Sequence, residues 1–158
     1  MTEKKEVQNI VLVTLNDNFS KRVTSFLAEK LDMHFVDCYD MVVYDLINPK
    51  EVIDKCGIEY FKMREKGVIK NCSSFLNTCI SINYDLLVQN LECFNKSYII
   101  YLKLPYEKIT KIPNKIDFEN RDKRLEKIAD NCICLDKKSC NRAAELIIKR
   151  MGELYENS

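Results

Sequence analysis

The chain has 158 residues, of which 46% are hydrophobic and 31% are charged, a composition that suits one compact domain with a real core. Its 25 Lys and Arg residues balance 24 Asp and Glu residues, so the charge gives no electrostatic case for binding nucleic acid or an anionic membrane. No apolar run reaches the ~20 residues that a membrane-spanning helix needs, and the short polar N-terminus is unlike a signal peptide. We therefore expect a cytoplasmic protein.

Predicted strands and helices alternate along the chain. The strands are expected at residues 9–14, 33–37, 77–82, 97–104 and 131–136. The helices are expected at residues 20–31, 41–47, a segment that starts at Asn48-Pro49, 59–70, 84–91, 117–129 and 141–154. This alternation favours a three-layer α/β/α fold whose parallel sheet is covered on both faces. We expect a single domain over residues 1–158, with polar tails at 1–8 and 155–158.

Eight cysteines are scattered along the chain without any C-x-x-C pair, and His34 is the only histidine. A zinc site needs neighbouring ligands of these types. The pattern therefore predicts reduced cytosolic cysteines and no metal site.

The turn after the first predicted strand reads Thr14-Leu15-Asn16-Asp17-Asn18-Phe19-Ser20-Lys21-Arg22. A strand, a turn and a helix at the start of an α/β chain is where a phosphate-binding loop usually lies. Such a loop needs glycine, because its backbone must approach the phosphates closely. The three glycines of this chain are Gly57, Gly67 and Gly152, and none of them follows an apolar strand.

Five fragments, in order, resemble the shikimate kinases, which are small P-loop enzymes similar to nucleoside-monophosphate kinases. The fragments are NIVLV…LAEKLDMHFVDCYDMVVYDL, GIEYFKMRE, CISINYD, YIIYLKLPYEKI and NRDKRLEKIADNCICLD, and the similarity runs from about residue 9 to residue 154. The resemblance implies a five-stranded parallel sheet of order 2-3-1-4-5 with the first strand in the centre. It also implies phosphoryl transfer from ATP to shikimate, with Mg²⁺.

The family's Walker A loop, G-x-x-x-x-G-K-[ST], is lost in this chain. Aligned without gaps, the glycines of the family's loop fall on Thr14, Asp17 and Phe19. The lysine of the family falls on Ser20 and the Mg²⁺-binding hydroxyl falls on Lys21.

These replacements predict a closed loop. Side chains at Asp17 and Phe19 would block the close approach that glycine permits, and Asp17 adds a negative charge where a polyphosphate would lie. Lys21 comes one position late, and a helix turns about 100° per residue, so its side chain points elsewhere. We expect Phe19 to pack inward against Leu15 or Val23, and we expect no bound cofactor.

The acceptor side is also changed. In the family's D-T-D motif, Asp37 matches the aspartate that serves Mg²⁺, whereas Tyr39 replaces the aspartate expected to be the general base, and the neighbouring Asp40 is in a different register. Lys62 replaces an arginine that clamps the substrate carboxylate, and Arg121 matches the second such arginine. The expected remnant of the acceptor pocket is therefore Asp37, Lys62 and Arg121.

Two further elements of the family's site differ. Asn83-Tyr84-Asp85 stands where the family has a triple glycine, and Leu125 replaces a tyrosine. The segment between Leu104 and Arg121 is too short for the family's lid and contains no arginine. The lid is therefore expected to be shortened.

The leading hypothesis is a catalytically inactive pseudokinase that acts through a protein partner or as a structural subunit. One alternative is a working small-molecule kinase with an aberrant loop, which would need ATP and Mg²⁺. Another is a protein that binds a shikimate-like carboxylate without catalysis, for which Lys21, Arg22, Lys62 and Arg121 offer positive charge. Each retained residue also has a plain structural interpretation: Asp37 could simply cap the next helix, and the cations could belong to a solvated surface.

Overall fold

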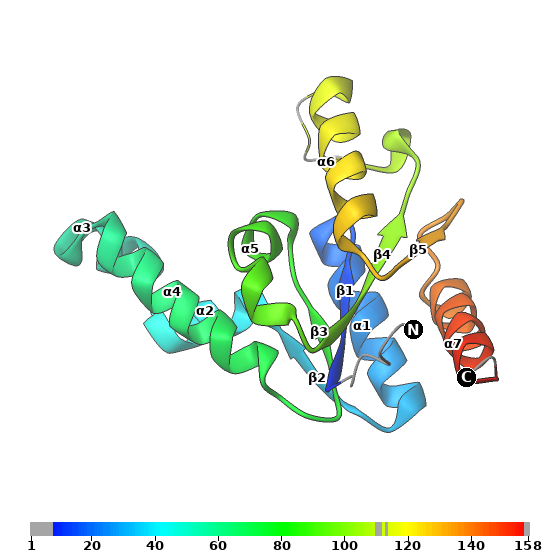
Figure 1. Cartoon of the computed structure of the whole chain (residues 1–158). Coiled ribbons are helices and arrows are strands. Elements are labelled where there is room, and N and C mark those ends of the chain that lie inside the picture. The colour runs from blue at the N-terminus through cyan, green and yellow to red at the C-terminus, as the bar shows by residue number, and fades with distance from the viewer. Residues whose placement is uncertain (1–7, 110–111, 113, 157–158) are drawn as a thin grey trace.

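The computed structural model describes residues 8–109, 112 and 114–156, without the side chains of Asp17 and of residues 154–156 (Figure 1). Its five strands are β1 (Asn9–Val13), β2 (His34–Asp37), β3 (Thr78–Ser81), β4 (Ser97–Lys103) and β5 (Asn131–Cys134). Neighbouring strands pair in parallel in the order β2-β3-β1-β4-β5. The predicted α/β fold and strand order are confirmed.

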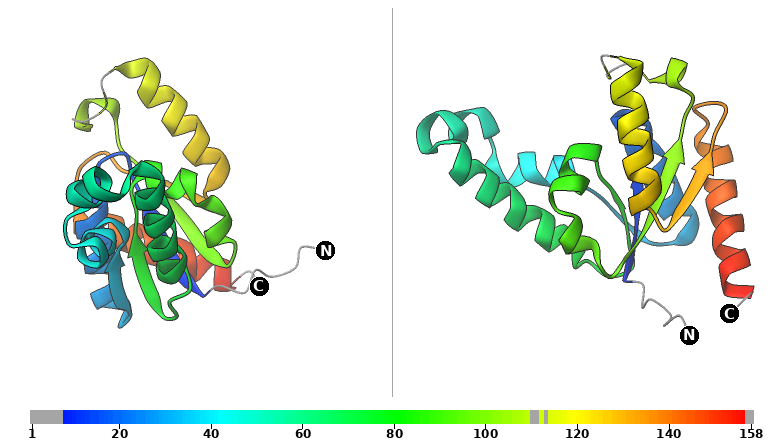
Figure 2. Two further views of the ribbon diagram at one scale, coloured as in Figure 1. Left: turned by 90° about the vertical axis from the view of Figure 1, so that its left-hand side faces the viewer. Right: turned by 45° about the horizontal axis from the view of Figure 1, so that its top comes forward.

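The helices cover both faces of the sheet. They are α1 (Asp17–Leu31), α2 (Cys38–Leu46), α3 (Pro49–Cys56), α4 (Ile58–Ser73), α5 (Tyr84–Gln89), α6 (Lys115–Ile128) and α7 (Cys140–Glu156), with short 3₁₀ turns η1 (Leu91–Phe94) and η2 (Tyr106–Lys108). Helices α1 and α7 pack side by side on one face, and α5 and α6 lie on the other (Figures 1 and 2). None of the described helices is long and apolar enough to span a membrane.

The core forms around the central strand β1, which is buried along its whole length. Helix α1 presents Phe19, Val23 and Leu27 to the sheet, and all three side chains are fully buried. These residues are spaced four apart, so they form one stripe on the helix. Burying each such side chain contributes about 1.5–3 kcal/mol.

Helix α1 begins three residues earlier than the sequence pattern predicts. Its N-cap is Asn16, whose side-chain oxygen accepts a hydrogen bond from the Phe19 amide at 3.1 Å. Asparagine is among the best N-cap residues because it satisfies an amide that has no partner within the helix. The apolar stripe alone placed the start at Ser20, since the first turn contributes only Phe19 to the core.

Helices α2, α3 and α4 form an arm that projects from the sheet, with α3 at its tip (Figure 1). The arm is weakly buried: no described residue of α3 is buried, and the buried residues of α4 begin only at Val68. An Arg64–Asp45 ion pair at 2.9 Å joins α4 to α2.

The connection from β4 to α6 spans residues 104–114 and contains η2. It corresponds to the predicted shortened lid, of which residues 110, 111 and 113 lie outside the described part of the chain. The rings of Tyr106 and Phe118 lie 5.3 Å apart and hold η2 against α6. The Tyr101 hydroxyl donates a 2.6 Å hydrogen bond to Asp122, which ties α6 to the sheet.

The turn between α2 and α3 is strained. Ile47 has φ 60° and ψ −56°, and the Asn48 amide donates a 2.6 Å hydrogen bond to the Leu46 carbonyl across it. This is the rare form of the γ-turn, and a β-branched residue at positive φ is a genuine outlier. The Ile47 side chain is 86% exposed, so little packing compensates for the strain.

We predict that Ile47→Gly raises the free energy of unfolding by about 1 kcal/mol, because glycine adopts this backbone conformation freely and strain of this kind costs of order 1–3 kcal/mol. Urea denaturation would measure the change. The control is Leu76→Gly, another exposed apolar residue without positive φ, which should not gain stability. If Ile47→Gly lowered the free energy of unfolding as much as Leu76→Gly does, the turn at Ile47 would not be strained.

Candidate functional site

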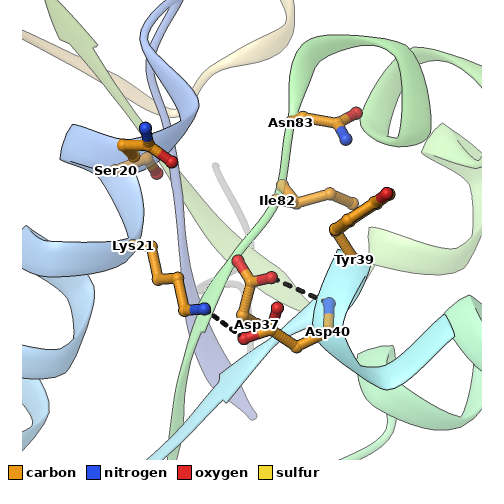
Figure 3. A pocket seen from close by; sticks show the side chains of 8 residues that line it. Ser20, Lys21, Asp37, Tyr39, Asp40, Ile82 and Asn83 are labelled. Carbon is orange, nitrogen blue, oxygen red and sulfur yellow. Dashed lines mark hydrogen bonds and ion pairs between the residues drawn. The ribbon is translucent and has the colours of Figure 1, made fainter. Parts of the chain in front are cut away.

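An open cleft lies where the carboxyl ends of β1, β2 and β3 meet, which is where ligands bind in open α/β sheets. Its volume is about 340 Å³. It is lined by Asn18, Ser20, Lys21, Asp37, Tyr39, Asp40, Ile82 and Asn83 (Figure 3). The lining comes from the first turns of α1 and α2, the end of β2, and the residues that follow β3.

The first turn of α1 forms one wall of the cleft, and its core-facing side chains pack closely against the sheet. The Phe19 side chain is fully buried, in the same core cluster as Leu15 and Val23. The Ser20 hydroxyl donates a 3.2 Å hydrogen bond to the Leu12 carbonyl and is itself buried. The Ser20 hydroxyl is therefore directed to the protein's own backbone.

The other two predicted loop positions lie on either side of the Asn16 cap. Thr14 follows β1 and is fully buried, and its hydroxyl has no hydrogen-bond partner among the described residues. Asp17 is the first residue of α1, and its side chain lies outside the described part of the structure. Their predicted effect on phosphate binding stays a prediction.

Lys21 reaches across the cleft to α2. Its ammonium group forms an ion pair with the Asp40 carboxylate (Figure 3). The hydrogen bond to Asp40 raises the pKa of Lys21; burial opposes this effect, and the negative charges of Asp40 and Asp37 add to it. The ammonium group is therefore firmly charged at neutral pH.

Asp37 is engaged on both carboxylate oxygens. It is the N-cap of α2, and its Oδ2 accepts a 2.9 Å hydrogen bond from the Asp40 amide. Its Oδ1 accepts a hydrogen bond from the Ser81 hydroxyl on β3. The capping interpretation of Asp37 is thus correct, and the carboxylate is held in place at the floor of the cleft.

The two other residues of the predicted acceptor remnant are not among the residues that line the cleft. Lys62 is exposed on α4. Arg121 is half-buried on α6, and its guanidinium lies 4.9 Å from the centre of the Tyr84 ring. The remaining cation of the turn, Arg22, lies 5.8 Å from the centre of the Phe19 ring. That Lys62 and Arg121 share one carboxylate stays a prediction.

Tyr39 and Asn83 complete the lining on the acceptor side. Tyr39 is 58% exposed, with its side chain at the edge of the cleft. The Asn83 carboxamide oxygen caps α5 by accepting a 2.8 Å hydrogen bond from the Leu86 amide. Among the described residues, no group of three or more His, Cys, Asp or Glu side chains could hold a metal ion, and all eight cysteines are free.

Sequence reasoning missed three interactions of the cleft. The Asn16 cap had a readable signal, because an asparagine precedes the apolar helix stripe at cap distance. The sequence carries no signal for the Lys21–Asp40 ion pair or for the Ser81–Asp37 hydrogen bond. Each joins residues that are far apart in the sequence, and each depends on side-chain direction.

The comparisons with known proteins agree with this architecture of a parallel sheet with flanking helices. The family model described as shikimate kinase matches residues 21–152, and the chain therefore belongs to the shikimate kinase family. No curated protein matches the chain significantly.

Solved shikimate kinases share the fold at low sequence identity. The enzyme from Aquifex aeolicus has a TM-score of 0.72 at 20% identity, over 91% of this chain and 96% of that chain. The enzyme from Acinetobacter baumannii, in complex with shikimate, has a TM-score of 0.69 at 18% identity, over 94% and 95%. The enzyme from Bacteroides thetaiotaomicron has a TM-score of 0.65 at 18% identity, over 94% and 98%.

We predict that Asn16→Ala lowers the free energy of unfolding by about 1 kcal/mol, since it leaves the Phe19 amide of the first turn without its cap. The matched control is Asn18→Ala, an exposed asparagine two residues later, which should change stability by less than about 0.5 kcal/mol. Urea denaturation distinguishes the two. Equal effects of both substitutions would show that the cap does not hold this turn.

Proposed function

We propose that this member of the shikimate kinase family does not transfer phosphate and acts as a binding or structural protein. The observation that carries the proposal is the first turn of α1, where Phe19 is fully buried at a position that the family reserves for glycine. The family match begins at residue 21, so the preceding turn lies outside it.

The residues of this turn do not fit ATP with Mg²⁺. A phosphate-binding loop offers free backbone amides at a helix N-terminus. Here the Phe19 amide donates to Asn16, the Ser20 hydroxyl donates to the Leu12 carbonyl, and the Lys21 ammonium is paired with Asp40. Of the groups that would bind a polyphosphate in the family, the glycines are absent, and the Phe19 amide, the Ser20 hydroxyl and the Lys21 ammonium have partners within the chain.

The acceptor side supports the same proposal. A general base must reach the proton that it removes. Asp37 accepts two hydrogen bonds from within the protein, and Tyr39 stands at the family's base position. Phosphoryl transfer depends mainly on positioning and charge neutralisation, so the loss of several of these groups together removes most of the catalytic effect.

The alternative is a divergent small-molecule kinase, and the open cleft favours it. The cleft lies at the expected end of the sheet and keeps Asp37 in its wall. For catalysis, the Asn16 cap would have to open and Lys21 would have to leave Asp40 when ATP binds. A second alternative, a carboxylate-binding protein, would use Lys62 and Arg121 without any nucleotide.

We predict no release of ADP above background when the purified chain is incubated with saturating ATP, Mg²⁺ and shikimate. Removing one electrostatic donor typically costs ~10²–10³ in rate, and several are missing here. Turnover near the ~1–100 s⁻¹ of kinases would overturn the proposal, provided that Lys21→Ala or Asp37→Asn abolishes it and so excludes a contaminating enzyme.

We further propose that the protein acts through a protein partner that contacts the projecting arm. Tyr44 and Met63 on the arm are 81% and 61% exposed, and they lie on the two helices joined by the Arg64–Asp45 pair. A contiguous exposed apolar surface is typical of a protein interface, and we take these side chains to form one. The strained, exposed Ile47 at the same arm supports this proposal, because strain that packing does not explain often marks a functional position.

The arm surface can be tested with a single charged substitution. We predict that Ile47→Asp abolishes recovery of a stoichiometric partner in pull-downs from the native cell, whereas Leu76→Asp, at an exposed apolar residue off the arm, leaves it intact. Equal recovery by the wild-type chain and both variants would contradict the role of the arm.

A further inference from the structure

We propose that the Lys21 ammonium group is a built-in counter-ion that takes the place of a divalent metal ion in the cleft, so that the cleft is formed without metal. The inference deepens the proposed function and rests on it for one point, the correspondence of position 21 to the family's Mg²⁺-binding hydroxyl. The remaining support comes from contacts within this chain.

The direction of the Lys21 side chain is fixed by its two preceding neighbours. Phe19 is buried in the core and Ser20 is buried against the Leu12 carbonyl, so both face the sheet. A helix turns about 100° per residue, which leaves Lys21 on the side of α1 that faces the end of β2. There its ammonium group meets Asp40, with Asp37 close by (Figure 3).

A positive charge on the side of α1 stabilises the carboxylates of Asp37 and Asp40. The Asp40 amide donates to the Asp37 carboxylate, which holds the Asp37 side chain at the start of α2, where the Asp40 side chain also begins. Asp37 also affects Lys21 electrostatically, although only Asp40 is paired with it directly. Like charges held this close repel, and a nearby cation removes the repulsion.

The charge of the cleft follows from its lining. Among the described residues that line it, Lys21 is the one cation and Asp37 and Asp40 are the two carboxylates. The other lining side chains are uncharged: Asn18, Ser20, Tyr39, Ile82 and Asn83. With Lys21 in place, the described lining keeps about one negative charge, which disfavours a polyphosphate, and the ammonium group occupies the position beside Asp40 that a metal ion would take.

A simple surface ion pair is the competing explanation. The two side chains are 45% and 51% exposed, and a pair of this kind contributes ~0–1 kcal/mol to stability. The surface-pair explanation and the counter-ion explanation predict different results when the Lys21 ammonium group is removed. A surface pair would leave two solvated carboxylates, whereas a counter-ion would leave two neighbouring carboxylates that bind a cation together, through oxygen ligands of the kind that Mg²⁺ and Mn²⁺ prefer.

The test is Mn²⁺ binding to Lys21→Met, which removes the charge and keeps most of the side-chain length. We expect this variant to bind one Mn²⁺ at least about tenfold more tightly than the wild-type chain, measured by electron paramagnetic resonance of free Mn²⁺. The control is Lys66→Met, which removes the same charge from an exposed pair with Glu92 and should leave Mn²⁺ affinity unchanged. Adding Asp40→Asn to Lys21→Met should abolish the gain.

Two results would overturn the inference. One is equal Mn²⁺ affinity of Lys21→Met and Lys66→Met, and the other is a wild-type chain that already binds Mn²⁺ in the cleft as tightly as Lys21→Met. Lys21 is half exposed, so Lys21→Met and a second variant, Lys21→Gln, should both fold, and thermal unfolding with and without Mn²⁺ confirms it. Kinase activity of the wild-type chain would defeat the proposed function and leave this metal measurement unaffected.

Discussion

The burial of the Phe19 ring is the constraint on which the rest of the cleft depends. A fully buried aromatic side chain at the third position of α1 holds the first turn of this helix against the sheet. The segment from β1 to α1 is then short, and Asn16 is left in the position where it caps the helix. The close backbone approach that glycine would allow is replaced by core packing, and the Phe19 amide and the Ser20 hydroxyl have hydrogen-bond partners within the chain.

The same constraint connects α1 to the projecting arm. With Phe19 and Ser20 turned to the sheet, Lys21 faces Asp40, and Asp40 donates its amide to Asp37. Asp37 in turn accepts a hydrogen bond from the Ser81 hydroxyl on β3. One continuous set of contacts therefore joins α1, the start of α2 and strand β3 of the sheet. Because α2 begins the arm, the closed turn and the exposed arm surface are parts of one connected structure.

The sequence predicted the overall architecture well and the cleft only in part. Alternating apolar segments predicted the strands and helices, and the resemblance supplied the strand order. The apolar residues at helical spacing between residues 20 and 31, Val23 and Leu27 among them, were enough to expect the buried face of this helix. These features depend on local periodicity, which a single sequence contains.

The remaining features depend on side-chain direction in three dimensions. In the sequence, Asp40 is only a displaced neighbour of the position where the family has its general base. Its pairing with Lys21 depends on how α1 and α2 meet in space. The stacking of Arg121 on Tyr84 has the same origin. The strained turn at Ile47 could not be read either, because nothing in the residue type indicates a positive φ.

The central claim is that the first turn of α1 no longer accepts a nucleotide. The most direct measurement is isothermal titration of the wild-type chain with Mg-ATP, with shikimate titrated in parallel. The account predicts no saturable heat from Mg-ATP up to millimolar concentration, whatever the response to shikimate. One-to-one binding of Mg-ATP with a micromolar Kd, weakened by Lys21→Ala, would contradict it.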